Sequence, residues 1–134
     1  MNKILIKNGS AFVIVVFAVA VLAVLTIGIL QLNTEELQIM RNNIDATKAM
    51  ATAEAGLNDA FAQLRTDPNW TSGFTNKAFS VNTYTVTVAG AVPNLTVTST
   101  AVTAEGFTAR MSADITTGSP APYAIRIDKL RINE

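Results

Sequence analysis

The most constraining feature of the sequence is an uncharged apolar run at residues 11–30, interrupted only by Thr26 and Gly28. An α-helix rises about 1.5 Å per residue, so a run of this length covers the roughly 30 Å hydrocarbon core of a bilayer. A secretory signal peptide has a shorter apolar region, of roughly 7 to 15 residues, followed by a small-residue cleavage site. We therefore expect this segment to span a membrane and to stay attached to the rest of the chain.

The charges on either side of the apolar run predict its orientation. Lys3 and Lys7 precede the run, whereas Glu35 and Glu36 follow it. Positive residues stay preferentially on the cytoplasmic side of a membrane. We therefore expect a single-pass protein of the inner (cytoplasmic) membrane, with its N-terminus inside, residues 10–32 in the bilayer and most of the chain outside.

The composition narrows the class of function. Ten basic residues balance ten acidic ones, which does not favour a nucleic-acid partner. The chain has no histidine and no cysteine, and it shows no Gly-rich phosphate loop and no paired-carboxylate motif. Asp114 and Asp128 are isolated acids, whereas a calcium site needs several clustered oxygens. We expect a protein that is not an enzyme, with no catalytic residues, no metal site and no cofactor.

A helical pattern continues directly beyond the apolar run. Apolar residues recur every three to four positions through residues 33–65, with most charged residues on other faces, which is typical of an amphipathic helix. These apolar residues are Leu37, Met40, Ile44, Ala53, Leu57, Ala60, Phe61 and Leu64. Pro68 disfavours helical backbone at Asp67 and so predicts an end near Arg65. Because no proline lies earlier, we expect one continuous helix from Ser10 to Arg65.

After a polar connector at residues 66–77, the period changes from helical to twofold, which predicts β-strands. We expect four strands, at residues 78–88, 95–102, 107–116 and 123–130. In the first of them, Phe79 and Val81 are out of phase with the residues that follow, which predicts a β-bulge near Asn82 and Thr83. The expected fold class is α+β, in which the second half of the long helix packs against a small antiparallel sheet.

The globular part of the chain is expected to comprise residues 33–134, with the sheet at residues 78–134. Trp70 and Phe74 lie in the connector, where aromatic side chains at a sheet edge usually tuck underneath, so we expect them to be buried. Three basic residues near the C-terminus are expected to line a solvated strand edge, where charge discourages unwanted strand pairing; the alternative is that they contact phosphate or an acidic partner. These are Arg126, Lys129 and Arg131.

Together these segments resemble the type IV pilin-like family. The resemblance rests on Lys7-Asn8-Gly9-Ser10 followed at once by the apolar run, on the helix through Ala53-Glu54-Ala55-Gly56-Leu57, and on Asp67-Pro68-Asn69-Trp70 before a small sheet. Within the family, the chain is most similar to the minor pilins and pseudopilins of the PilX and GspK groups. The resemblance covers the whole chain, but its specific part is the first 70 residues.

The resemblance implies a particular life cycle. Residues 1–9 would be a basic prepilin leader, which a prepilin peptidase removes between Gly9 and Ser10, and the new amino group of Ser10 would be methylated. The subunit would lie in the membrane before assembly. Its apolar helix would then leave the bilayer and pack among other pilin subunits as the core of an extracytoplasmic filament, with residues 33–134 as the globular pilin head.

One departure from the family pattern concerns Ile14. Major pilins carry a glutamate at the fifth mature position, which is thought to neutralise the N-terminal ammonium of a neighbouring subunit inside an apolar core, where an unpaired charge is costly. Ile14 cannot do this. The departure implies a minor, initiating or tip-proximal subunit, for which few interfaces lack the charge pair. The alternative is a divergent major pilin whose system does not use that pair.

The residues also favour assembly without reference to a family. A helix that is apolar on every face needs lipid or other helices around it. Small residues at Ala18, Ala20, Ala23 and Gly28 allow close helix approach, and Gly28 is where we expect the span to loosen most readily. A different class of function stays open, in which the span is a permanent anchor and the globular part binds a partner at the cell surface.

Overall fold

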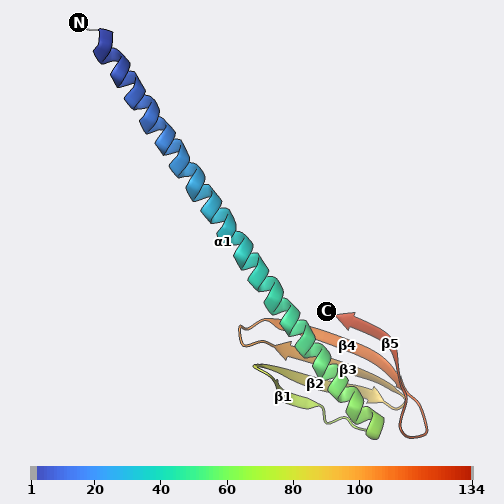
Figure 1. Ribbon diagram of the computed structural model, residues 1–134. Coiled ribbons are helices and arrows are strands. Elements are labelled where there is room, and N and C mark those ends of the chain that lie inside the picture. The colour runs from blue at the N-terminus through green and yellow to red at the C-terminus, as the bar shows by residue number, and fades with distance from the viewer. Residues whose placement is uncertain (1–2, 134) are drawn as a thin grey trace. The chain divides into compact units, whose positions relative to one another are not determined.

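The computed structural model describes the backbone of residues 3–133 and the side chains of residues 9–133 (Figure 1). It contains one helix and five strands, which are α1 (Lys3–Thr66), β1 (Phe74–Phe79), β2 (Asn82–Ala91), β3 (Asn94–Val102), β4 (Thr108–Thr117) and β5 (Ile125–Ile132). The chain divides into two compact units, Met1–Arg41 and Asn42–Glu134, which we call the N-terminal unit and the C-terminal unit. The expected α+β class is confirmed.

The N-terminal unit consists of the first part of α1. Within residues 9–41, its large apolar side chains are 41–70% exposed, from Val21 at the lower limit to Phe12 and Phe17 at the upper one. The helix that begins near the N-terminus is long and apolar enough to cross a membrane. Because these apolar side chains point in all directions around the helix, they need lipid or other helices to remove them from water.

The end of α1 follows from the residues around Pro68. The helix ends at Thr66, one residue beyond the predicted end at Arg65. The backbone N–H of Asp67 still donates to the carbonyl of Gln63 at 2.9 Å, and the Asp67 carboxylate then accepts the N–H of Asn69 at 2.9 Å. Proline offers no N–H for a further helical turn, so the chain leaves the helix at this point.

The sheet has five strands instead of the four that were expected. They follow one another in the order β1-β2-β3-β4-β5, and every neighbouring pair is antiparallel, so the sheet is a simple meander (Figure 1). The additional strand, β1, begins at Phe74 inside the segment predicted as a connector, residues 66–77. All of its residues except Phe74 are exposed, so its sequence lacks the apolar alternation that identifies a half-buried strand.

The predicted β-bulge near Asn82 and Thr83 is wrong. A two-residue turn at Ser80 and Val81 joins β1 to β2, so that Phe79 pairs directly with Asn82. Ser80 has a φ of 57° and supplies the left-handed backbone that a tight hairpin requires. Phe79 and Val81 are therefore out of phase with β2 because the chain reverses between them, and not because an extra residue is inserted in one strand.

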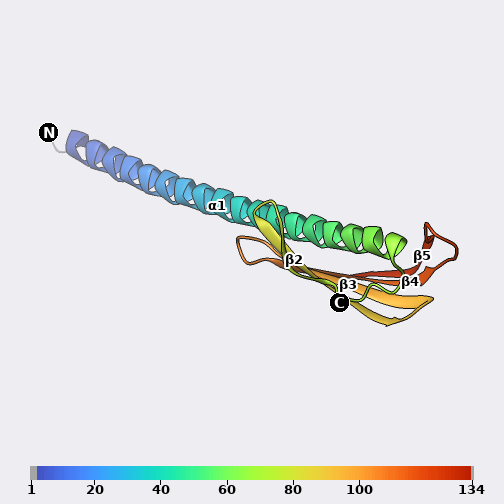
Figure 2. The same ribbon diagram turned by 90° about the horizontal axis from the view of Figure 1, so that it is seen from below.

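The core of the C-terminal unit lies between α1 and one face of the sheet, as both views show (Figure 1, Figure 2). From α1 it takes a stripe of mostly small residues at helical spacing, and from the sheet it takes alternate residues of the three central strands. The buried apolar side chains are Ala49, Ala53, Leu57, Ala60, Leu64, Tyr84, Val86, Leu95, Val97, Ala101, Ala109, Met111, Ala113 and Ile115. Alternation within strands thus sends threonines outward and apolar residues toward the helix.

The sheet covers less of α1 than expected. Burial begins at Ala49, whereas Leu37, Met40 and Ile44 are 57%, 58% and 50% exposed. Ala53 lies nine positions after Ile44, which is two and a half turns at 3.6 residues per turn, so these two side chains lie on opposite faces of the helix. The apolar pattern of residues 33–65 is therefore two stripes with different phases, and the sheet packs against the later one.

The expected burial of the connector aromatics is found only in part. Trp70 and Phe74 are partly buried and pack against the core. Their ring centroids are 5.1 Å apart, and the Phe74 ring meets the Tyr84 ring edge-on with centroids 6.2 Å apart. Aromatic pairs at these separations stabilise a fold beyond the area that they bury. The contacts of Trp70 and Phe74 thus hold the segment between α1 and the start of β1 against the edge of the core.

Candidate functional site

The residues expected at the processing site lie in α1. Gly9 and Ser10 are both exposed, and a Cβ added at Gly9 would meet no atom within 4 Å. Ile14, where the resemblance would place the glutamate of a major pilin, is 65% exposed. The remainder of the expected leader consists of residues 1–8, of which residues 1–2 lie outside the described part of the chain. Both residues that flank the predicted scissile bond thus lie at the surface of the N-terminal unit.

The small residues predicted to support helix packing do not form one stripe. Ala20 and Ala23 are three positions apart and share a face, whereas Ala18 lies about 200° away from Ala20 around the helix. Gly28 lies eight positions after Ala20 and so falls about 80° from it. Of the four residues, Ala20 and Ala23 are the pair that helical geometry brings together.

Two shallow apolar hollows on the surface of α1 meet at Ala20. One is lined by Phe12, Val13, Val16, Phe17 and Ala20, and the other by Ala20, Val21, Val24 and Leu25. The short side chain of Ala20 leaves space between its larger neighbours. A notch of this kind accepts a side chain from a facing helix, in the way that knobs enter holes in packed helices.

In the C-terminal unit, Asp59 joins three elements. Its carboxylate accepts a hydrogen bond from the Lys77 ammonium of β1 at 2.6 Å and another from the Tyr84 hydroxyl of β2. The Lys77 Nζ also lies 4.3 Å from the centroid of the Phe74 ring. The hydrogen bonds from Lys77 and then Tyr84 hold the pKa of Asp59 below its ordinary value. Burial, followed by the hydrogen bond to Asp59, raises the pKa of Tyr84.

Because the pKa of Asp59 is lower in the folded chain than in the unfolded one, its contribution to stability is present above about pH 4 and is lost as the pH falls through the depressed value. We expect Asp59→Asn to reduce the free energy of unfolding at pH 7 by no more than about 1 kcal/mol, because the ion pair is half exposed. The difference from the wild type should shrink as the pH falls from 4 to 2 in chemical denaturation. Glu54→Gln, which removes an exposed carboxylate of α1, is the matched control and should cost less at pH 7.

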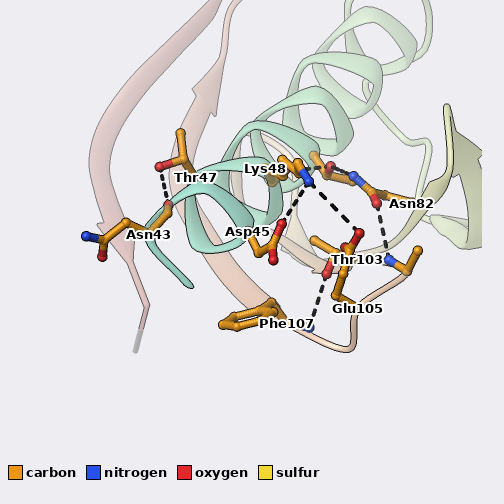
Figure 3. Close-up of polar contacts among 10 residues, drawn as sticks. Asn43, Asp45, Thr47, Lys48, Asn82, Thr103, Glu105 and Phe107 are labelled. Carbon is orange, nitrogen blue, oxygen red and sulfur yellow. Dashed lines mark hydrogen bonds and ion pairs between the residues drawn. The ribbon is translucent and has the colours of Figure 1, made fainter. Parts of the chain in front are cut away.

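A second polar cluster joins α1 to the start of β2 and to the turn between β3 and β4 (Figure 3). The buried side-chain amide of Asn82 donates to the Thr52 hydroxyl of α1 at 3.1 Å, and its oxygen accepts the N–H of Ala104 at 3.3 Å. The N–H of Phe107 donates to the Thr103 hydroxyl at 3.1 Å and closes the turn between β3 and β4. Asn82 therefore links the helix, the start of β2 and this turn through one side chain.

An exposed ion pair lies beside the Asn82 cluster (Figure 3). The Lys48 ammonium is 2.8 Å from an Asp45 oxygen and 3.9 Å from a Glu105 oxygen in the turn after β3. The hydrogen bond to Asp45 raises the pKa of Lys48. Exposed pairs of this kind contribute little to stability, so the Asn82 hydrogen bonds are the more important contacts in this region.

The C-terminal basic residues lie on β5, which is an edge strand as expected, but only Arg126 and Lys129 are exposed, whereas Arg131 is partly buried. Arg131 reaches Asp114 of β4 at 2.6 Å, and Arg126 reaches Asp128 at 2.6 Å. Hydrogen bonds from Arg131 and then Thr96 lower the pKa of Asp114. Within the described residues, no group of three or more acidic, histidine or cysteine side chains is placed to hold a metal ion.

Sequence patterns did not identify the Asp59 and Asn82 clusters. One available indication was that Tyr84 occupies an inward-facing strand position, where a tyrosine hydroxyl usually needs a hydrogen-bond partner. Another was the spacing of Thr52, Gly56 and Asp59, which places the three residues on one flank of α1. Neither indication names the partner, because the contacts join residues that are 18 to 30 positions apart.

Comparison of the chain with known protein families, with characterised proteins and with solved structures finds no match. The functional interpretation therefore rests on the residues themselves, on the exposed apolar helix of the N-terminal unit and on the packing of the C-terminal unit.

Proposed function

We propose that this chain is a structural subunit of a type IV pilus or of a related secretion or DNA-uptake filament, assembled through the apolar part of α1. The observation that carries the proposal is the exposure of large apolar side chains all around residues 11–30, on a helix that continues to Thr66 beneath a small antiparallel sheet. Such a surface is stable in lipid and equally stable among identical helices. The same segment therefore suits a membrane before assembly and a filament core afterwards.

The packing surface of the N-terminal unit supports helix-to-helix assembly. Its two shallow hollows meet at Ala20, and Ala23 lies on the same face as this residue. Interfaces between membrane helices are enriched in small residues because these allow the backbones to approach closely. In the proposal, a large side chain of a neighbouring subunit fills the notch at Ala20.

Ile14 favours a minor, initiating or tip-proximal subunit within such a filament. An apolar side chain at this position cannot neutralise the N-terminal ammonium of a neighbour, and an unpaired charge in an apolar core is costly. A subunit present at few positions imposes this cost only a few times. Imaging filaments that carry a label on the C-terminal unit tests the point, since a label along the whole shaft would exclude a minor role.

The processing step distinguishes the proposal from a permanently anchored surface binding module. In cells that contain a prepilin peptidase, we expect the mature wild-type chain to begin at Ser10, with its mass increased by one methyl group. Gly9→Val should abolish this cleavage, because glycine allows the backbone next to the scissile bond to approach the enzyme closely. Intact-mass measurement of the purified protein checks both expectations.

The matched control for this prediction is Gly28→Val, which changes a second glycine of α1 whose Cβ position is also open. This variant should be cleaved like the wild type. A wild-type protein that keeps residues 1–9 would contradict the filament proposal and favour the permanent anchor.

A further inference from the structure

A repeat of seven residues runs along α1 within the N-terminal unit, from Val16 to Met40. In a heptad written a to g, the side chains at positions a and d form one seam, which faces a second helix in a left-handed coiled coil. All of the side chains at these positions are exposed. The seam, which we call the heptad seam, consists of Val16, Ala23, Leu30 and Leu37 at position a and of Val19, Thr26, Asn33 and Met40 at position d.

The residues that follow the apolar run select this register of the heptad. Leu37 and Met40 lie on one face of α1, three positions apart, whereas Ile39 lies on another face. Leu37 and Met40 also lie beyond residues 11–30, the run that is long enough to cover the bilayer. Burial of these two side chains against a facing helix therefore removes apolar surface from water, not only from lipid.

The charges beside the seam complement a second copy of the same helix. Glu36 occupies position g and Arg41 occupies position e of the next heptad, and residues at e and g form the ion pairs between coiled-coil helices. When two such helices are parallel and in register, Glu36 of each faces Arg41 of the other, so the ion pair forms twice. Within the described residues, neither side chain has an ion-pair partner.

Two polar residues, Thr26 and Asn33, lie within the seam. The Thr26 hydroxyl donates to the Leu22 carbonyl at 2.8 Å and is satisfied inside its own helix. The side-chain amide of Asn33 makes no hydrogen bond in the part of the chain that the structure describes. Asparagine side chains hydrogen-bond between neighbouring membrane helices, and a single asparagine in a coiled-coil seam fixes the register. Asn33 thus suits a partner that presents the same amide at the same level.

We propose that the heptad seam docks on the heptad seam of a second copy of this chain, in a parallel pair that forms in the membrane. Copies of one sequence insert with the same orientation, so their helices meet in parallel. The same surface is used on both copies, so the contact is isologous and closes on itself. A closed pair recruits no third copy through this seam, which agrees with a subunit that is present at few positions. The inference rests on the membrane span of the proposed function, but not on the filament.

The absence of cysteine allows a direct test by disulfide cross-linking of the full-length chain in isolated membranes. Two differently tagged copies that carry the same single cysteine are produced together. Met40→Cys should give about tenfold more disulfide-linked dimer than Ile39→Cys, because a disulfide requires the two Cα atoms to lie within about 7 Å and only position 40 faces the seam. Ile39 is a matched control, since the two neighbouring apolar residues are 60% and 58% exposed.

Reversal of one charge tests the ion pairs without altering the seam. Glu36→Lys in both copies should lower the yield of the Met40→Cys dimer severalfold, because two positive charges then face each other, and adding Arg41→Glu should restore it. Glu35→Lys makes the same change of charge at position f, which points away from the seam, and should leave the yield unchanged. All three charged side chains are exposed, so the fold is expected to tolerate these changes.

The outcomes separate the inference from the proposed function. A Met40→Cys dimer that exceeds the Ile39→Cys dimer, with no filament recovered, supports the pair and counts against the filament role. Recovered filaments, with equal dimer yields from the two cysteine variants in the membranes, overturn the inference alone. A Met40→Cys dimer that responds equally to Glu35→Lys and Glu36→Lys also overturns it, because the pairing then does not depend on the heptad positions.

Discussion

Shortening Leu64 to alanine is expected to destabilise the C-terminal unit by about 2–5 kcal/mol, the usual range for removing a large buried aliphatic side chain. Leu64 has no exposed surface and lies at the end of the α1 stripe that packs on the sheet. The loss combines the transfer free energy of the removed atoms with the cavity that they leave. Chemical denaturation of the full chain in detergent micelles, followed by the fluorescence of Trp70, the single tryptophan, measures the effect.

The matched control is Leu37→Ala, which makes the same chemical change in the same helix. Leu37 is 57% exposed, so its truncation should change the free energy of unfolding by no more than about 0.5 kcal/mol. Equal losses at the two positions would contradict the assignment of α1 burial to the segment that begins at Ala49. The comparison therefore tests which of the two apolar stripes of residues 33–65 belongs to the core.

The second large loss of stability is expected on substitution of Gly56. Among the glycines of α1, this is the one that lies closest to the sheet. A Cβ at this position would lie 2.3 Å from the Ser99 hydroxyl oxygen and 2.8 Å from a ring carbon of Tyr84. Alanine improves helix propensity by up to about 1 kcal/mol, whereas overpacking a core costs about 1–3 kcal/mol. We expect a net destabilisation of about 1–2 kcal/mol for Gly56→Ala, measured in the same denaturation experiment.

Two further variants identify the cause of the Gly56→Ala effect. Gly28→Ala, at an open position of α1, should show the gain in helix propensity without a clash. Ser99→Ala should recover part of the loss when combined with Gly56→Ala, because it removes the nearest atom and leaves the Tyr84 ring in place. Ser99 Oγ is buried with no hydrogen-bond partner among the described residues, so the single variant Ser99→Ala is needed to complete the mutant cycle. No coupling between the two positions would contradict the steric explanation.

The close approach at Gly56 also explains how the two polar clusters form. Thr52, Gly56 and Asp59 lie on one flank of α1 that faces β2. Thr52 accepts a hydrogen bond from Asn82, and Asp59 accepts one from Tyr84. Between them, Gly56 lies against Tyr84 and against Ser99 of β3. A larger residue in the middle of this flank would move the helix away from both hydrogen-bonded ends. The stability of the unit therefore depends on a small residue between two polar contacts.

Most of the secondary structure could be predicted because it has local causes. Apolar residues at helical spacing predicted α1, and Pro68 predicted its end to within one residue. Strict alternation predicted the strand that the structure places at Thr108–Thr117. β1 was missed because its exposed residues carry no alternation and because Ser80, not glycine, supplies the left-handed turn position.

The candidate site residues likewise fall into those that the sequence could predict and those that only the structure revealed. Gly9, Ser10 and Ile14 could be proposed from the sequence, because the roles proposed for them depend on residue type and on position relative to an apolar run. The Asp59 cluster could not be selected, because it depends on which strands are neighbours and on how α1 packs on the sheet. A periodic pattern predicts whether a side chain points toward the core or toward solvent, but it does not predict which residue of another element the side chain contacts.

The sequence by itself determined that this chain has a helix able to cross a membrane, where that helix ends, and that a sheet follows it, because length, periodicity and proline act over a few residues. Only the tertiary structure decided that the sheet packs on the stripe from Ala49 to Leu64, that Gly56 sets the helix-to-sheet distance, and that β5 keeps an apolar face half exposed. Those properties arise from contacts between distant segments, whose free energy depends on how several elements fit together and is not contained in any one of them.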